Sequence, residues 1–272
     1  MSSLVQHSLL IDAGNTRIKW AVFQSGALGM PMRWLAQGSV DHAQVAELAS
    51  QWRDLRADEV LVSNVAGEAL QQALQQAVDA SFPGISVSRF RADTKIAGLQ
   101  NHYRNPQQLG SDRFASALAA HHFFPDTALV VATCGTATTV DAIIPGKGFV
   151  GGMILPGLQT MAVSLAQNTA QLPQIARDLS LDSLFADNTQ QAIMSGCIHA
   201  QLGAIQCAIE ALEQQAASPV ELVLSGGAVP YLQPHWQQLQ AKRQTHVIDN
   251  LVLTGLAVVA QDRQLPQFSS DL

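Results

Sequence analysis

The sequence predicts an α/β fold built from two similar domains that face each other across a cleft. Short apolar runs typical of buried strands alternate with segments of helical spacing. Two stretches about 120 residues apart share one pattern, in which an apolar run precedes a polar residue, a small residue and a glycine. These stretches are LLIDAGNT (9–16) and VVATCGTA (130–137). A chain of 272 residues can form two domains of ordinary size, and we expect 1–123 and 124–272.

Composition excludes several classes of partner. The net charge of −6 and the lack of a long basic run argue against binding to nucleic acid or to an anionic membrane. Apolar runs fall short of the roughly 20 residues that span a bilayer. The start of the chain lacks the features of a secretory signal. Three scattered cysteines (Cys134, Cys197 and Cys207) suit a reducing compartment, so we expect a cytoplasmic protein.

Residues 8–23 predict a β-hairpin with a tight turn and a carboxylate next to that turn. Asp12 ends the first apolar run and is placed to hold a hydrated Mg²⁺. A glycine in the turn lets the backbone approach a ligand closely, and Lys19 can lie near phosphate. An alternative is that Asp12 only caps the turn. The candidate phosphate-binding residues of this turn are Gly14, Asn15, Thr16 and Lys19.

The next segments continue the α/β alternation. Residues 26–38 predict a turn and a short strand. An Asp cap and helical spacing of apolar residues predict a helix over 41–56. A strand at 60–62, a helix at 67–80 and a strand at 85–90 follow.

Residues 101–113 predict a loop that leads into a helix over about 112–123. Asp112 falls in the first turn of this helix, where the positive helix end favours a carboxylate. One interpretation is that Asp112 is simply a cap. The guanidinium of Arg113 beside it makes that account less complete, because a cap needs no neighbouring cation.

The strand at 128–133 then enters the second glycine turn. Residues 146–151, GKGFVG, match a dinucleotide-binding pattern, but an apolar strand follows them where that motif needs a helix, and no acidic residue occurs over 142–177. We therefore expect a hairpin turn at 146–148. A helix follows Pro156-Gly157, and 168–173 predict a polar loop.

The remaining elements are two helices, two strands and a second glycine pair. Thr189 is expected to cap a helix that starts at Gln190. The strand at 222–224 is followed by Gly226 and Gly227. These glycines either let the flat ring of a ligand lie against the backbone or form an ordinary turn. A short strand at 247–248 and an apolar helix at 251–260 complete the chain.

Four separated stretches together resemble the type III pantothenate kinase family, also known as the Bvg accessory factor family. The resemblance runs from about Leu9 to Leu256. It implies an actin-like fold of two ribonuclease H-like domains and ATP-dependent phosphorylation of pantothenate. It further implies a homodimer, Mg²⁺ with ATP, and a stimulating K⁺ or NH₄⁺. The stretches are DAGNT (12–16) with Lys19, YRNP (103–106) with LGSDR (109–113), GTATTVD (135–141), and GG (151–152) with PG (156–157) and TAQLP (169–173).

The resemblance also implies roles for individual residues. Asp12 resembles the metal-side carboxylate and Asp112 the general base that accepts the hydroxyl proton. Asp141 is a second candidate cation ligand. The residues expected at the substrate are Tyr103, Gly110, Ser111, Asp112, Arg113, Thr169 and Thr189. The residues expected at ATP, besides those of the first hairpin, are Gly135, Thr136, Ala137, Thr138, Gly226 and Gly227.

One position departs from the family pattern. The family has Asp two residues before the glycine of the second turn, and here that residue is Thr133. Either Asp12 and water suffice for Mg²⁺, or the monovalent-cation site is altered, or activity is weaker. Thr133 also favours an alternative, a regulatory protein that binds ATP or pantothenate without turnover. A different enzyme of the actin superfamily is a third possibility, against which the 103–113 stretch argues.

Overall fold

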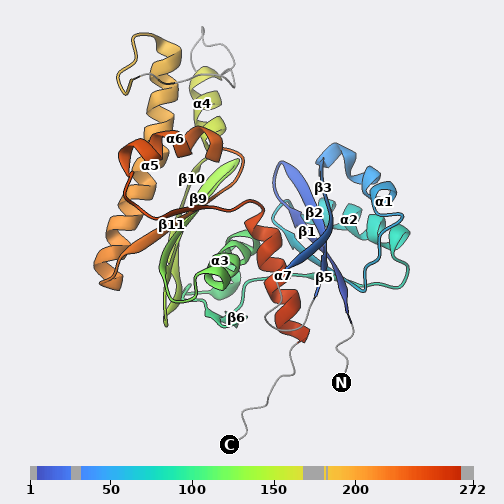
Figure 1. Ribbon diagram of the computed structural model, residues 1–272. Helices are drawn as coiled ribbons and strands as arrows, with labels where there is room; N and C mark the ends of the chain where they lie inside the picture. Colours follow the sequence, from blue (N-terminus) through green and yellow to red (C-terminus); the bar gives the residue numbers. More distant parts are fainter. Residues whose placement is uncertain (1–4, 26–31, 168–180, 182, 265–272) are drawn as a thin grey trace, which may run out of the picture. The chain divides into compact units, whose positions relative to one another are not determined.

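The computed structural model describes residues 5–25, 32–167, 181 and 183–264. The chain divides into two compact units (Figure 1). The first contains the residues up to Phe123 together with the segment from Leu251, and the second contains Phe124–Asn250.

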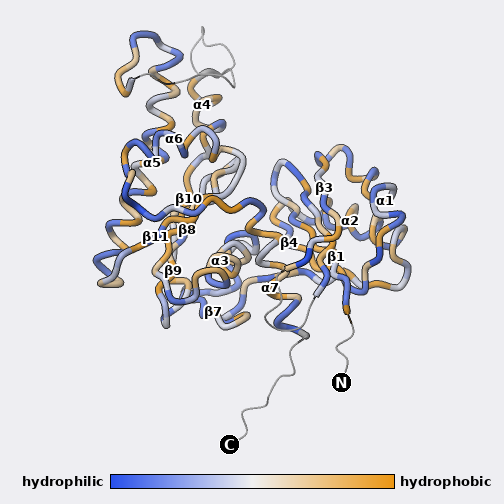
Figure 2. The backbone as a smooth tube through the Cα atoms, viewed as in Figure 1, coloured by the Kyte–Doolittle hydropathy of each residue, from blue (hydrophilic) through white to orange (hydrophobic). Residues whose placement is uncertain are grey.

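Unit 1 is built on a five-stranded sheet of order β3-β2-β1-β4-β5. The central strand β1 pairs antiparallel with β2 and parallel with β4. Hydrophobic residues line β1 and β4, whose segments are largely orange in Figure 2. The strands are β1 (His7–Ala13), β2 (Arg17–Gln24), β3 (Arg33–Asp41), β4 (Glu59–Asn64) and β5 (Val87–Arg89).

The two faces of this sheet differ in chemistry at the end of β1. Leu9, Ile11 and Ala13 point into a core that α1 and α2 cover. Side chains alternate along a strand, so Asp12 lies on the opposite face. The helices and small elements of unit 1 are η1 (His42–Glu47), α1 (Leu48–Gln51), α2 (Glu68–Ser81), β6 (Lys95–Ile96), β7 (Leu99–Gln100), η2 (Pro106–Gln108), α3 (Ser111–Phe123) and α7 (Leu251–Gln264).

Unit 2 repeats the same sheet. Its order is β10-β9-β8-β11-β12, with β8 antiparallel to β9 and parallel to β11. The predicted α/β class and the internal repeat are therefore confirmed. The 146–148 segment joins two antiparallel strands, as expected of a hairpin. The strands are β8 (Ala128–Cys134), β9 (Ala137–Ile144), β10 (Gly148–Pro156), β11 (Val220–Ser225) and β12 (Thr245–Val247).

The helices of unit 2 are α4 (Leu158–Gln167), α5 (Thr189–Ala216) and α6 (Val229–Leu239). The prediction that Thr189 caps α5 is wrong. The cap is Asn188, which has an extended backbone and whose side-chain oxygen accepts the Gln191 N–H at 3.0 Å. By length and composition α5 is long and apolar enough to cross a membrane. This is weak evidence, because a core helix packed on a sheet passes the same test, and α5 packs on β8, β9 and β11.

The last helix departs from the expected domain division. We expected 124–272 to form the second domain, but α7 belongs to unit 1. It packs on β1, β2, β4 and α3. Gly255 makes the contact with α3 possible, because a Cβ there would collide with the backbone carbonyl of Ala115. The apolar side chains of α7 are buried, and their burial drives the helix onto unit 1.

Candidate functional site

The turn between β1 and β2 presents polar groups beside a carboxylate. The Gly14 N–H donates to the carbonyl of Arg17 at 3.1 Å and closes the turn. Asn15 and Thr16 are exposed. Lys19 stands directly opposite Asp12 in the antiparallel pair, so the two side chains share one face of the sheet. The predicted grouping of these residues at one turn is confirmed.

A hydroxyl pair brings Asp112 to the same face. Ser63 of β4 is the parallel neighbour of Asp12. The hydroxyls of Ser63 and Ser111 hydrogen-bond at 2.8 Å, which fixes the start of α3 over the end of β1. Asp112 follows Ser111 in the first turn of that helix. Sequence reasoning missed Ser63, and its place at the end of a predicted buried strand was the available signal.

Both carboxyl groups have raised pKa values, and the charge of Asp112 contributes to the rise at Asp12. Burial, then the charge of Asp112, raises the pKa of Asp12 to about 7, and Lys19 only partly opposes this rise. Burial also raises the pKa of Asp112, although the Arg113 N–H donates to its Oδ1 at 2.9 Å and the Arg113 charge favours the ionised form. Titratable groups with such shifts gather at functional sites.

This pair of carboxylates fits a divalent cation. Two acidic side chains that repel each other in a partly buried place are stabilised when a cation binds between or beside them. Mg²⁺ takes oxygen ligands, needs only one or two carboxylates, and keeps several waters. Among the described residues, no group of three or more His, Cys, Asp or Glu side chains forms a closed metal site. The arrangement therefore suits a hydrated ion shared with a phosphate.

A buried arginine lies next to Asp112. Arg113 is 6% exposed, its Nη1 donates to the Tyr103 hydroxyl at 2.9 Å, and its guanidinium lies 5.6 Å from the centre of the Tyr103 ring. Asn101 holds this loop, because its Oδ1 accepts the Tyr103 N–H at 3.0 Å. At Gly110 a Cβ would come within 2.6 Å of an Asp112 oxygen. The structure thus brings together the predicted residues of 103–113.

A cavity of about 440 Å³ opens beside this loop in unit 1. It lies at the carboxyl ends of β4 and β5, where α/β proteins commonly bind ligands. Its lining includes Asn64, Arg89, Arg91, Gly110 and Ser111. A cavity of this size and polarity suits a small polar molecule.

The second glycine turn is braced by the start of α4. The Gly135 N–H donates to Ala137 O at 3.0 Å, so this turn closes one residue sooner than the first turn, where Gly14 donates to Arg17. The carbonyl of Thr136 accepts from the Gly157 N–H at 3.0 Å and from the Thr160 hydroxyl at 2.7 Å. A Cβ at Gly157 would collide with the carbonyl of Gly135. These contacts hold an exposed turn in one shape.

The glycine pair after β11 lies against the same turn. Gly226 has φ +101°, and a Cβ there would collide with the backbone of Cys134. The Ala228 N–H donates to Cys134 O at 3.0 Å. Gly227 is exposed, with open space around its Cα. The two predicted stretches of backbone therefore meet at one end of the unit 2 sheet.

This close approach gives a stability prediction. We expect Gly226→Ala to lower the free energy of unfolding by about 1–3 kcal/mol from its backbone conformation alone, with the contact to Cys134 adding to the loss. Urea denaturation measures the change. Gly227→Ala is the matched control, and we expect it to change stability by less than about 1 kcal/mol. Equal stability of the two variants would contradict this account.

Several other residues predicted from the sequence are buried, or lie outside the described residues. Thr138 is fully buried, backbone and side chain alike, whereas Gly135, Thr136 and Ala137 before it are exposed. Asp141 is 1% exposed and lies opposite Val131 in the β8–β9 pair. It is two residues along β9 from Thr139, the partner of Thr133, so Asp141 and Thr139 share one face of the sheet. Thr169 lies outside the described residues. Neutral Thr133 occupies the strand position that corresponds to Asp12.

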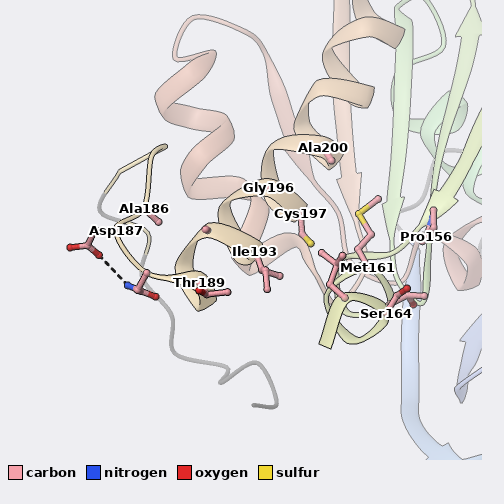
Figure 3. A pocket seen from close by; sticks show the side chains of 14 residues that line it. Pro156, Met161, Ser164, Ala186, Asp187, Thr189, Ile193, Gly196, Cys197 and Ala200 are labelled. Carbon is pink, nitrogen blue, oxygen red and sulfur yellow. Dashed lines mark hydrogen bonds between the residues drawn. The ribbon is translucent and has the colours of Figure 1, made fainter. Parts of the chain in front are cut away.

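Thr189 lines a separate groove of about 970 Å³ between α4 and α5 in unit 2 (Figure 3). Met161 of α4 and Cys197 of α5 border its apolar part, while Thr189 lies near the first turn of α5. The groove is larger than the cavity beside Gly110, and most of its lining residues are apolar. The chemistry of unit 1 therefore identifies the candidate catalytic residues better than cavity size does.

Comparison with known proteins decides the family. The sequence profile of the type III pantothenate kinases matches residues 8–211. The chain is 48% identical to the type III pantothenate kinase of Janthinobacterium sp. (strain Marseille), over 93% of this chain and 96% of the relative. It belongs to the type III pantothenate kinase family. The same enzyme of Herminiimonas arsenicoxydans is 49% identical over the same shares, and that of Burkholderia thailandensis is 39% identical over 93% and 97%.

Solved structures agree with the fold expected of a type III pantothenate kinase. A Campylobacter jejuni protein assigned to the Baf family of transcriptional activators has a TM-score of 0.55 at 18% identity, with 94% of this chain and 100% of that chain covered. Porphyromonas gingivalis acetate kinase has a TM-score of 0.54 at 11% identity, with 95% and 100% covered. The actin-like fold and the family resemblance are both confirmed.

Proposed function

We propose that this type III pantothenate kinase transfers the γ-phosphoryl group of ATP to the primary hydroxyl of pantothenate, the first step of coenzyme A synthesis. The observation that carries the proposal is the pair of interacting carboxylates, Asp12 and Asp112, beside a glycine turn and a buried arginine. Phosphoryl transfer asks a protein mainly to position its reactants and to neutralise spreading charge. Asp112 would position the acceptor hydroxyl, while the donors of the turn and a cation held by Asp12 would neutralise the charge.

The proton of the acceptor hydroxyl passes to Asp112. A carboxylate in this position orients the hydroxyl and accepts its proton as the bond to phosphorus forms. The Arg113 charge keeps Asp112 available as an acceptor by opposing the effect of burial. Arg113 itself, held by Tyr103, pairs with the carboxylate or the amide oxygen of pantothenate.

The ATP phosphates lie along the two glycine turns. The proposed phosphate-binding groups are, in unit 1, the backbone N–H groups of Gly14, Asn15 and Thr16 with the Lys19 ammonium, and in unit 2, 135–138 with the Gly226-Gly227 pair. Asp12 would hold Mg²⁺, which when bound neutralises phosphate charge. Asp141 is proposed as a further cation ligand. We also propose that K⁺ or NH₄⁺ stimulates the enzyme and that it works in the cytoplasm as a soluble homodimer, with Thr169 and Thr189 near pantothenate.

The Tyr103 hydroxyl offers a selective test of the substrate side. Tyr103→Phe keeps the ring but removes the oxygen that accepts from Arg113. A hydrogen bond to a charged group contributes about 1.5–3 kcal/mol, so we expect KM for pantothenate to rise about tenfold or more. Steady-state kinetics should show KM for ATP nearly unchanged. An unaltered KM for pantothenate would remove Arg113 from substrate binding.

The function itself is tested with purified protein, ATP, Mg²⁺ and pantothenate, with and without K⁺ or NH₄⁺. Formation of phosphopantothenate, detected by mass spectrometry, supports the kinase. Binding of ATP and pantothenate without product supports the alternative that Thr133 favours, a sensing protein of the same fold. Rates equal in K⁺, NH₄⁺ and a bulky organic cation would exclude monovalent-cation stimulation.

A further inference from the structure

The carbonyl of the first turn is held by a histidine outside the recognised motifs. The Nε2 atom of His42 lies 2.8 Å from the Gly14 carbonyl oxygen. A carbonyl oxygen can only accept, so Nε2 carries the hydrogen and donates it. His42 is half-buried, and its backbone begins η1.

The residue before His42, Asp41, is held by contacts to Gln44 and to Arg17, and these contacts position His42. Asp41 ends β3 and caps η1 through a reciprocal pair with Gln44. Asp41 also pairs with Arg17 across the strands, and its carboxylate accepts from Arg17 Nε at 3.0 Å. The Arg17–Asp41 pair is more than half exposed and contributes little energy itself. The His42 ring restrains the Gly14 carbonyl directly, through a hydrogen bond.

A restraint on this carbonyl also aims the next N–H group. The peptide between Gly14 and Asn15 is planar and trans, so its C=O and N–H point in opposite directions. With the carbonyl turned to His42, the Asn15 N–H is turned away from η1. Glycine at 14 leaves this peptide free to rotate unless something holds it. Catalytic donors are most effective when their orientation is fixed before the ligand arrives.

We propose that His42 is a positioning residue for ATP, which orients the Asn15 N–H toward a phosphate through its hydrogen bond to Gly14. This inference rests on the proposed ATP-binding role of the first turn. His42 contacts the first turn through Gly14, whereas on the proposed substrate side the Arg113 Nη1 donates to the Tyr103 hydroxyl. The expected effect therefore falls on nucleotide affinity alone.

The test compares His42→Ala with His42→Gln, whose side-chain amide can donate to the same carbonyl. Calorimetric titration with MgADP should show about tenfold weaker binding for the Ala variant, the effect of one lost hydrogen bond. The Gln variant should bind within about threefold of the wild type. KM for ATP should follow these changes, while KM for pantothenate stays constant and the melting temperature of the Ala variant falls by no more than about 4 °C. His122→Ala, an exposed histidine on α3, is the matched control.

Three results would overturn the inference. They are wild-type affinity of the Ala variant for MgADP, equal weakening in the Ala and Gln variants, and parallel losses in pantothenate affinity and melting temperature. If His42→Ala fails to fold, His42→Asn replaces it, because the shorter amide cannot reach Gly14. Absence of MgADP binding by the wild-type protein would instead refute the proposed ATP site, and with it this role of His42.

Discussion

Asp112→Asn should retain the fold and lose most of its turnover. The amide oxygen can still accept the Arg113 N–H, so the start of α3 is preserved, but the amide cannot take up the hydroxyl proton. A general base contributes about 10²–10⁴-fold to rate, and we expect a fall of kcat in that range. Circular dichroism tests whether the fold is retained, and the rate of phosphopantothenate formation measures the fall in kcat.

Nucleotide affinity provides the control for this variant. Removing the Asp112 charge also removes a repulsion that raises the pKa of Asp12. The loss of one carboxylate near the cation opposes this gain, so we expect MgADP to bind Asp112→Asn with an affinity similar to that of the wild type, because Asp12 is retained. If Asp112→Asn has a normal kcat, Asp112 is not the general base. If the variant instead loses affinity for MgADP, Asp112 helps to hold the nucleotide.

Asp12→Asn should abolish activity while making the metal-free protein more stable above neutral pH. In the folded chain the Asp12 pKa is about 7, against an ordinary value of 3.8. The ionised carboxylate is therefore disfavoured in the folded state, at a cost on the order of a few kcal/mol. An amide at this position avoids that cost but loses the ligand for Mg²⁺. Urea denaturation at pH 8 in EDTA, with the wild type in parallel, measures the gain.

The sign of the pH dependence follows from the raised pKa. Between about pH 4 and pH 7 the folded protein keeps a proton that the unfolded chain has released, so this group lowers stability as pH rises through that range. The stability gap between Asp12→Asn and wild type should open over this interval and stay constant above it. A gap that does not change with pH would mean that Asp12 is not the buried acid described.

The order of apolar, polar and glycine residues within short stretches predicted much of the fold and the turns, because strands and turns depend largely on residues that are close in sequence. The shared pattern of 9–16 and 130–137 predicted the repeated sheets, since an apolar run and a glycine turn form largely from their own residues. The β6–β7 hairpin was missed. Its turn uses Ala97 at φ +45° before Gly98, and alanine gives no signal of a left-handed conformation.

The neighbourhood of Asp12 and Asp112 could not be derived from spacing. The two residues lie 100 positions apart, and one hydroxyl contact between Ser63 and Ser111 fixes the start of α3. Neither serine is unusual in a sequence. The return of α7 to unit 1 was missed for a similar reason, because a helix that is apolar on all sides carries no indication of which core it joins.

That return of α7 has a consequence for biosynthesis. Unit 1 contains both the beginning of the chain and its last described helix, with all of unit 2 between them. As the chain leaves the ribosome, the β1–β5 sheet, complete at Arg89, therefore waits for about 160 further residues before the helix that packs on β1, β2 and β4 begins at Leu251. During that interval the face carrying Asp12 lacks part of its cover. We infer that the carboxylate site matures only after synthesis of the chain is nearly complete.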